Sequence, residues 1–237
     1  KKSFISFLPH KTPRKKQNKL INYYLQKLLK NPHLHDKIEF EIAINSFIFD
    51  FNQRFTQLNK NLLSKVDINI LKDSYKKIFI KNLNPKSVGS IQYNLNKLEY
   101  LESLYQSEDY KKIKLIEIIK NTKKYGTLPF SIFARHAFIA ENLLRSLERL
   151  KLLNYDDISI FKQNIETVTS KFVGECQKLS KNSIKFKDFL DEFGHLRPGT
   201  YDINSGDYRS YKKNFFIQKK NEKKNRKLFK LSFIKKK

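Results

Sequence analysis

Residues 18–31 read NKLINYYLQKLLKN, and this stretch indicates a helical fold. Its apolar side chains recur at the three- and four-residue spacing of one helix face, and Asn31-Pro32 ends the run. The same spacing predicts further helices at about 34–58, 67–81, 90–105, 109–121, 130–150, 156–179 and 185–193. Strand-like alternation is almost absent. We therefore expect an all-α protein, an irregular bundle of long helices with a motif-bearing loop near the C-terminal end.

The same pattern predicts local features of the chain and its division into domains. The apolar residues of 34–58 cover more than one helix face, which predicts a central helix buried on several sides. Asp67 is expected to cap the N-terminus of its helix. A chain break is expected at Tyr125-Gly126-Thr127 and Pro129. The domain prediction is a basic segment at 1–17, a helical domain at 18–211 and a lysine-rich tail at 212–237, whose low complexity is compatible with disorder.

Composition places the chain among packed cytoplasmic proteins. Hydrophobic residues make up 39% and aromatic residues 14%, whereas only six glycines and six prolines interrupt the chain. No stretch reaches the roughly 18 to 20 apolar residues of a membrane span, and the start KKSF lacks a signal-peptide hydrophobic region. We therefore expect no membrane partner. The single cysteine, Cys176, excludes an internal disulfide or a multi-cysteine zinc site and is expected to be a small core residue.

The formal net charge of +26 suggests a nucleic-acid partner, but the charge is concentrated at the two ends. Residues 1–20 carry +7 and residues 212–237 carry +11, which leaves +8 for the residues between them. Most cations are lysines accompanied by Asn, Ile, Phe and Tyr, a mixture that A/T-rich codons alone would produce. A basic helical nucleic-acid-binding protein is therefore kept as the alternative, with nucleic acid disfavoured as a partner.

The helical body offers few groups suited to catalysis. His33 and His35 flank Leu34, but no further His or Cys follows at metal-ligand spacing, so a helix cap by His35 and Asp36 is preferred to a metal site. Two glutamates at 39 and 41 are expected to be solvated or ion-paired. Cations at 135 and 136 stand near an expected helix N-terminus, where a bound anion or an acidic partner would explain them. No glycine-rich phosphate loop or nucleophile elbow is present.

The segment GHLRPGTYD, from Gly194 to Asp202, combines groups that bind anions and move protons. Its glycines and proline break the helical pattern, so it is expected to be a loop. Two interpretations remain open. In one, Arg197 binds phosphate or carboxylate oxygens through its guanidinium fork, and His195 or Asp202 manages a proton. In the other, Arg197 and Asp202 form an ion pair that fixes a structural corner.

Four segments occur in the order and spacing of one protein family. They are SFISFLP (3–9), NPHLHDKIEFEIA (31–43), YGTLPFSIFARHAFIAENLLRSL (125–147) and FGHLRPGTYDINSGDY (193–208). Across residues 3 to 211 the chain resembles the central region of bacterial enzymes related to phosphoenolpyruvate synthase and pyruvate phosphate dikinase. Within that group it is similar to the branch found with capsule and surface-polysaccharide genes, which includes L-glutamine kinase. The chain departs from the family at Gly206-Asp207, where a proline and an arginine before the tyrosine are usual.

The resemblance implies that the chain is the middle of a three-part ATP-dependent phosphotransferase. An ATP-grasp domain would precede it and a phosphohistidine domain would follow it, and both would be its partners together with a small-molecule acceptor such as glutamine, pyruvate or a sugar intermediate. ATP and Mg are implied for the complete enzyme and no cofactor for this chain, which alone should be inactive. The implied catalytic residues are His195 and Asp202. The implied substrate-binding residues are Arg197, Thr200 and Tyr201 on one side and Tyr125, Thr127 and Arg135 on the other.

Overall fold

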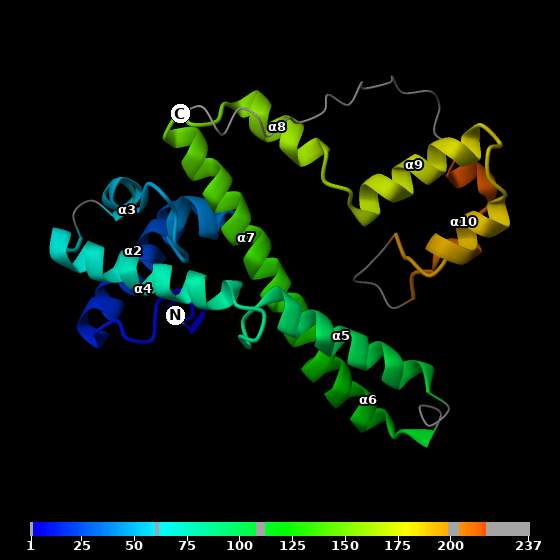
Figure 1. The fold of residues 1–237 in the computed structure, drawn as a ribbon, viewed down its shortest axis with the longest axis horizontal. Coiled ribbons are helices and arrows are strands. Elements are labelled where there is room, and N and C mark those ends of the chain that lie inside the picture. Colours follow the sequence, from blue (N-terminus) through cyan, green and yellow to red (C-terminus); the bar gives the residue numbers. More distant parts are fainter. Residues whose placement is uncertain (1, 60–61, 108–111, 199–203, 217–237) are drawn as a thin grey trace. The chain divides into compact units, whose positions relative to one another are not determined.

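A computed structural model gives the fold over residues 2–59, 62–107, 112–198 and 204–216 (Figure 1). All of the regular secondary structure in these ranges is helical, which confirms the expected all-α class. No helix among these residues is long and apolar enough to cross a membrane. The chain forms two compact units, Lys1–Leu153 and Asn154–Lys237. The boundaries predicted at 17/18 and 211/212 stay predictions.

Unit 1 contains a globular part and an arm. The globular part contains four α-helices, α1 (Lys2–Ile5), α2 (Arg14–Lys30), α3 (Phe51–Asn59) and α4 (Lys65–Leu83). Between α2 and α3 it also contains the 3-10 helix η1 (Pro32–Leu34) and the π-helix η2 (Ile38–Ile42). The arm consists of α5 (Ile91–Gln106), α6 (Leu115–Asn121), η4 (Thr122–Thr127) and the first half of α7 (Leu128–Arg149). The second half of α7 contacts the globular part, so α7 belongs to both.

The core of unit 1 forms around α2, whose Leu20 and Tyr24 are fully buried. This agrees with the helix face predicted for 18–29, although α2 begins earlier, after Pro13. The basic N-terminal segment also contributes to this core, because Phe4 and Leu8 are both buried in it. The Phe4 and Tyr24 ring centroids lie 5.6 Å apart. The first residues of the chain are therefore part of the fold of unit 1.

The predicted helix over 34–58 is wrong. Its place is taken by η1, the π-helix η2, a non-helical strap at residues 43–50, and α3. The strap starts at Ala43, whose backbone is extended (φ −129°, ψ 151°). The apolar residues between 38 and 44 recur at every second position, a period-2 pattern that disfavours an α-helix. Their β-branched isoleucines lower helix propensity further. The predicted cap by His35 and Asp36 is wrong as well, because Lys37 precedes η2 and makes no side-chain cap bond.

Two other predicted boundaries need correction. The N-cap of α4 is Ser64, which accepts a hydrogen bond from the backbone of Asp67, while the carboxylate of Asp67 binds Lys16. The chain break expected at 125–129 is absent. Instead α6 continues through the π-helix η4 into α7, and Pro129 stands in the first turn of α7, directly after η4.

The arm is a hairpin in which α5 packs against η4 and α7 (Figure 1). The predicted helices at 90–105 and 130–150 are confirmed as α5 and α7, and α5 starts after the N-cap Ser90. A Cβ atom at Gly126 would lie 3.2 Å from the Leu101 side chain, so the absence of a side chain lets η4 approach α5 closely. Within α5, Leu101 is the buried apolar residue at this contact.

Unit 2 contains α8 (Tyr155–Gln163), α9 (Val168–Ser180), α10 (Phe186–Phe193), η5 (Tyr208–Ser210) and η6 (Lys213–Phe215). The single helix predicted at 156–179 is wrong, because Thr167 and Ser170 form a capping box that starts α9 as a separate helix. The helix predicted at 185–193 is confirmed as α10. Aromatic rings dominate the core, and the ring centroids of Phe189 and Phe216 lie 4.9 Å apart. Cys176 is buried there, as predicted.

Candidate functional site

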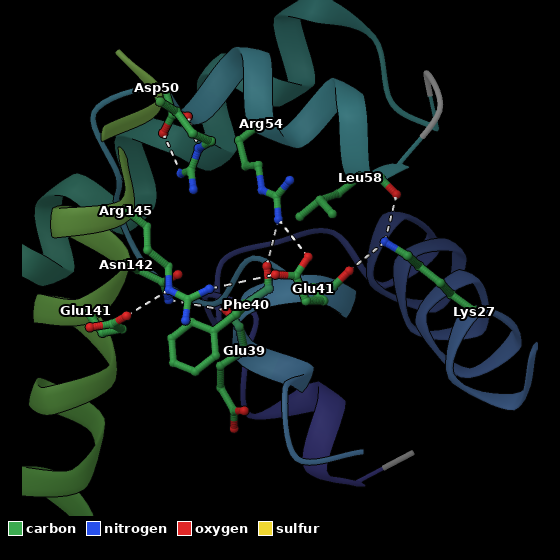
Figure 2. Close-up of polar contacts among 11 residues, drawn as sticks. Lys27, Glu39, Phe40, Glu41, Asp50, Arg54, Leu58, Glu141, Asn142 and Arg145 are labelled. Atoms are coloured by element: carbon green, nitrogen blue, oxygen red, sulfur yellow. Dashed lines mark hydrogen bonds and ion pairs between the residues drawn. The ribbon is translucent and has the colours of Figure 1, made fainter. Parts of the chain in front are cut away.

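The π-helix η2 is held by side chains from three other helices (Figure 2). It lasts for five residues, and the chain then becomes extended, so its later carbonyl groups have no donor from a following helical turn. Three consecutive carbonyls accept side-chain donors instead: Glu39 O from Asn142 Nδ2 of α7 at 3.2 Å, Phe40 O from Arg54 Nη2 of α3 at 2.8 Å, and Glu41 O from Lys27 Nζ of α2 at 2.8 Å.

The side chain of Glu41 joins two of the surrounding cations. Its carboxylate lies 3.3 Å from Arg54 Nη2 and 3.7 Å from Arg145 Nη1. Arg145 also donates from Nε to Glu141 at 2.8 Å, and its guanidinium lies 4.5 Å from the centre of the Phe40 ring. The sequence predicted that Glu41 would be solvated or ion-paired, and the ion pairing is confirmed. Figure 2 shows the carboxylate of Glu39 pointing away from this group.

We call this group the η2 cluster, and it consists of five charged side chains: Lys27, Glu41, Arg54, Glu141 and Arg145. Its three cations exceed its two carboxylates by one charge. Each of the three cations already donates to a carbonyl or a carboxylate of the protein. The geometry therefore serves to fix the π-helix between α2, α3 and α7, because groups engaged in this way hold a backbone in place without needing a bound ligand.

The C-terminal half of α7 also holds the strap at 43–50. Arg149 donates from Nε to Asp50 Oδ2 at 2.5 Å and from Nη2 to Asp50 Oδ1 at 3.0 Å. Ser146, which is fully buried, accepts from the backbone N–H of Phe49 at 3.4 Å. Asn142, Ser146 and Arg149 recur along α7 at helical spacing. They form a polar stripe that faces η2 and the strap.

The predicted site residues of unit 1 lie on the arm and are not part of the η2 cluster. Tyr125 belongs to η4, where its ring lies 4.8 Å from that of Tyr100 and 4.8 Å from Lys124 Nζ. The hydroxyl of Thr127 is 3.5 Å from the carbonyl of Thr122. Arg135 is exposed on α7, more than one turn after Leu128. The macrodipole argument for a bound anion at Arg135 is therefore wrong, since the dipole acts within the first turn.

The neighbouring His136 is half-buried, and burial lowers the pKa of its imidazole below the usual 6.5 because a charged ring is less well solvated there. In a neutral imidazole one ring nitrogen donates a hydrogen bond and the other accepts one. The sequence had singled out His136 because it stands beside Arg135 in the third motif.

The predicted loop of unit 2 is described in part. Thr200, Tyr201 and Asp202 lie outside the described residues, whereas His195 and Arg197 are exposed. The backbone N–H of Tyr208 donates to the carbonyl of Leu196 at 2.8 Å, which brings the two ends of the loop together. Gly194 is required at its start, because a Cβ atom there would lie 2.3 Å from the carbonyl oxygen of Leu190. Whether this loop faces Tyr125, Thr127 and Arg135 concerns both units and stays a prediction.

Sequence reasoning missed the cations that hold η2. Arg54 and Lys27 gave no signal, because single basic residues on helices are usually solvated. A usable signal was present at Asn142, Arg145 and Arg149. Polar residues on the apolar side of a strongly amphipathic helix indicate a buried polar contact. Within the described ranges, no group of three His, Cys, Asp or Glu side chains could hold a metal ion.

Comparison with known proteins gives no relative: no family model, curated protein or solved structure matches this chain significantly.

Proposed function

We propose that this chain is the central, substrate-positioning and domain-docking part of a cytoplasmic ATP-dependent phosphotransferase of the phosphoenolpyruvate synthase type, acting in capsule or surface-polysaccharide biosynthesis. One observation carries the proposal beyond the sequence resemblance. Two of the four family-like motifs, the second and the third, are far apart in the chain and contact each other directly in unit 1, and the first packs in the same hydrophobic core as the second. This contact supports the resemblance, because segments that pack against each other are expected to occur together in one family.

The second and third motifs meet at η2. Asn142 and Arg145 of the third motif bind the backbone of Glu39 and the carboxylate of Glu41 in the second, and the rings of Phe40 and Phe138 pack edge to face at 5.8 Å. These contacts combine backbone recognition, charge and aromatic packing. They fix the orientation of α7, and therefore of the arm that carries the predicted substrate-binding residues Tyr125, Thr127 and Arg135.

The first motif lies in the same hydrophobic core of unit 1 as the end of the second. The hydroxyl of Tyr75 donates to the carbonyl of Phe7 at 2.7 Å and lies 3.0 Å from the carbonyl of Ile44, the residue after the second motif. Burial raises the pKa of Tyr75 well above its usual value, because a phenolate would be poorly solvated there. The hydroxyl therefore remains a donor. It joins residues 7 and 44 at any ordinary pH.

In this proposal the fourth motif supplies the chemistry. The exposed guanidinium of Arg197 would bind the anionic group of phosphate or acceptor, and His195 or Asp202 would manage the acceptor proton. The complete enzyme would use ATP and Mg, whose cradle and metal clamp belong to other domains. No step in this chain requires a cofactor of its own.

The first test uses the chain alone with γ-labelled ATP, magnesium and the candidate acceptors glutamine and pyruvate. We expect neither ATP hydrolysis nor labelling of the protein, and an acid-labile label on any of its histidines would contradict the proposal. The second test reads the coding sequence on both sides and expresses the joined protein. We expect an ATP-grasp frame upstream and phosphoryl transfer by the joined protein. Flanking sequence of another class would also overturn the proposal.

The alternative, a basic nucleic-acid-binding protein, is favoured by one feature of the arm. Lys97 Nζ lies 4.8 Å from the centre of the Tyr93 ring, and Lys124 is placed in the same way over Tyr125. Side chains that pair a cation with an aromatic face can bind single-stranded nucleic acid.

A further inference from the structure

A small cavity of about 10 Å³ lies between η2, the strap at 43–50, α3 and α7. Polar residues from each of these elements contribute to its lining, among them Asn45, Ser46, Arg54, Asn142 and Arg149. A cavity of this size, measured for a water-sized sphere, accommodates about one water molecule. It is too small for an organic ligand or for phosphate.

Two oxygen atoms of the lining residues are buried without a hydrogen-bond partner among the described residues. They are Oγ of Ser46, a residue only 6% exposed, and Oδ1 of Asn45. Leaving a buried hydroxyl or amide oxygen without a partner costs about 1–3 kcal/mol per group. Buried polar groups in native proteins almost always have a partner, either from the protein or from ordered water.

We propose that this cavity is a binding site for one internal water molecule that bridges Asn45 and Ser46. Water is favoured by the chemistry of the lining. An apolar guest would leave both oxygens unpaired, and a cation such as ammonium would be placed beside two guanidinium groups, those of Arg54 and Arg149. Water both donates and accepts, so it satisfies the hydroxyl and the side-chain amide in either orientation of the amide.

The bridge would serve the irregular part of the fold. The strap at 43–50 has no regular hydrogen-bond ladder, and Asn45 and Ser46 stand at its centre. Its ends are held by protein groups, at Ile44 by Tyr75 and at Phe49 and Asp50 by α7. The water fills the gap between these two attachments, which completes the hydrogen bonding of the strap.

Crystallography of the protein and of Ser46→Val tests the site directly. In the wild-type protein we expect an electron-density peak within hydrogen-bond distance of Ser46 Oγ and the Asn45 side chain, equally strong in crystals grown with and without ammonium salts. In Ser46→Val the added methyl group should fill the cavity, so the peak should disappear. An ordered strap without a peak in the wild-type protein would overturn the proposal, and a peak that requires ammonium would replace water by a cation.

A measurement in solution also tests whether the cavity holds a water molecule. Oxygen-17 relaxation dispersion counts long-lived internal waters, and we expect Ser46→Val to have one fewer than the wild-type protein. If Ser46→Val does not fold, Ser46→Thr adds the methyl group while keeping the hydroxyl, and the same loss is expected. An unchanged count in a folded variant would contradict the proposal.

The direction of a stability change separates a hydrated site from a dry one. If water binds Ser46, Ser46→Ala removes a partner and enlarges the cavity, so the Tm of unit 1 should fall by about 2 to 6 °C. If the site is dry, the same change removes an unpaired buried hydroxyl and should leave the Tm unchanged or raise it. Ser103→Ala, at an exposed position on α5, is the matched control.

Discussion

Asp50 and Arg149, which are 99 positions apart in the chain, form a bidentate ion pair. The side chain of Asp50 is 2% exposed, whereas that of Arg149 is 30% exposed. The carboxylate is therefore almost fully removed from water and depends on the guanidinium for its solvation. The pair ties the end of the strap at 43–50 to the last turn of α7. Through α7 it also ties the globular part of unit 1 to the base of the arm.

Removal of Arg149 should therefore be costly. Arg149→Ala leaves a buried carboxylate without its partner, and we expect the free energy of unfolding of unit 1 to fall by about 3 kcal/mol, the lower part of the range for buried pairs because Arg149 keeps some solvent contact. Arg149→Lys keeps the charge but loses one of the two bonds, so its loss should be smaller. Urea unfolding followed by circular dichroism measures both.

The exposed pair of Arg209 and Asp207 provides the control. Its atoms are 3.0 Å apart, but both side chains are largely or partly in water, so Arg209→Ala should cost under about 1 kcal/mol in unit 2. Equal losses in Arg149→Ala and Arg209→Ala would show that Asp50 does not depend on Arg149 as the geometry implies.

Asn142 should matter through the backbone of the π-helix. Asn142→Ala removes the donor to the Glu39 carbonyl, so we expect a loss of about 1–3 kcal/mol in the stability of unit 1. The matched control is Asn52→Ala, at an exposed asparagine whose amide bonds Asn69 at 2.8 Å, and this variant should change stability by less than about 0.5 kcal/mol. If the two variants behave alike, the three-carbonyl arrangement contributes nothing to the position of η2.

The lowered pKa of His136 gives a pH dependence with a definite sign. Because burial lowers the pKa in the folded state, the unfolded chain binds the proton more readily once the pH falls below 6.5. Stability contributed by the neutral ring should therefore be present above 6.5 and be lost as the pH falls through the lowered pKa. An NMR titration of the His136 ring should have its midpoint below 6.5, and a midpoint at or above that value would contradict the assignment.

The helices that the sequence predicted well are those with one apolar face and clear ends. In α2 the face is set by Leu20, Tyr24 and their neighbours, and in α5 the start is set by the cap Ser90. Local chemistry decides such elements, so a sequence window contains the necessary information. The region 34–58 failed because its apolar residues satisfy both helical and alternating patterns. The choice between them depends on contacts made by α7, about 100 residues away.

The same reason explains why the η2 cluster was not predicted. Each of its cations is unremarkable in its own helix, and the carbonyls that they bind become available only because η2 ends after five residues. A π-helix depends on tertiary contacts that no local spacing rule describes. For Glu41 the sequence left solvation and ion pairing open, and the structure has the ion pairs with Arg54 and Arg145.

A separate measurement distinguishes the phosphotransferase role from nucleic-acid binding. The N-terminal segment cannot be deleted for this purpose, because Phe4 and Leu8 belong to the core. Glutamine should instead replace four exposed cations, Lys11, Arg14, Lys15 and Lys19, and the chain should end after Phe216. We expect this variant to keep its circular dichroism spectrum and to bind duplex DNA and single-stranded RNA weakly at about 0.15 M salt. Sub-micromolar binding by this variant would reverse the ranking of the two functions.

The last prediction concerns Arg197 in the joined protein that contains the flanking domains. Arg197→Lys keeps the charge but loses the planar fork. If Arg197 binds the phosphate or acceptor anion, turnover of the acceptor should fall by about 10- to 100-fold with little change in thermal stability, because a charge-assisted hydrogen bond contributes about 1.5–3 kcal/mol.

A structural corner would give the opposite result. If Arg197 and Asp202 only fix the loop, Arg197→Ala and Asp202→Ala should each lower the stability of unit 2, and the double variant should lose less than the sum of the two. Because Arg197 is exposed, that coupling should be under about 1 kcal/mol. Turnover at the wild-type rate in Arg197→Lys, combined with a measurable coupling, would exclude Arg197 as an anion-binding residue. The loop closed by Leu196 and Tyr208 would then have a structural role in unit 2.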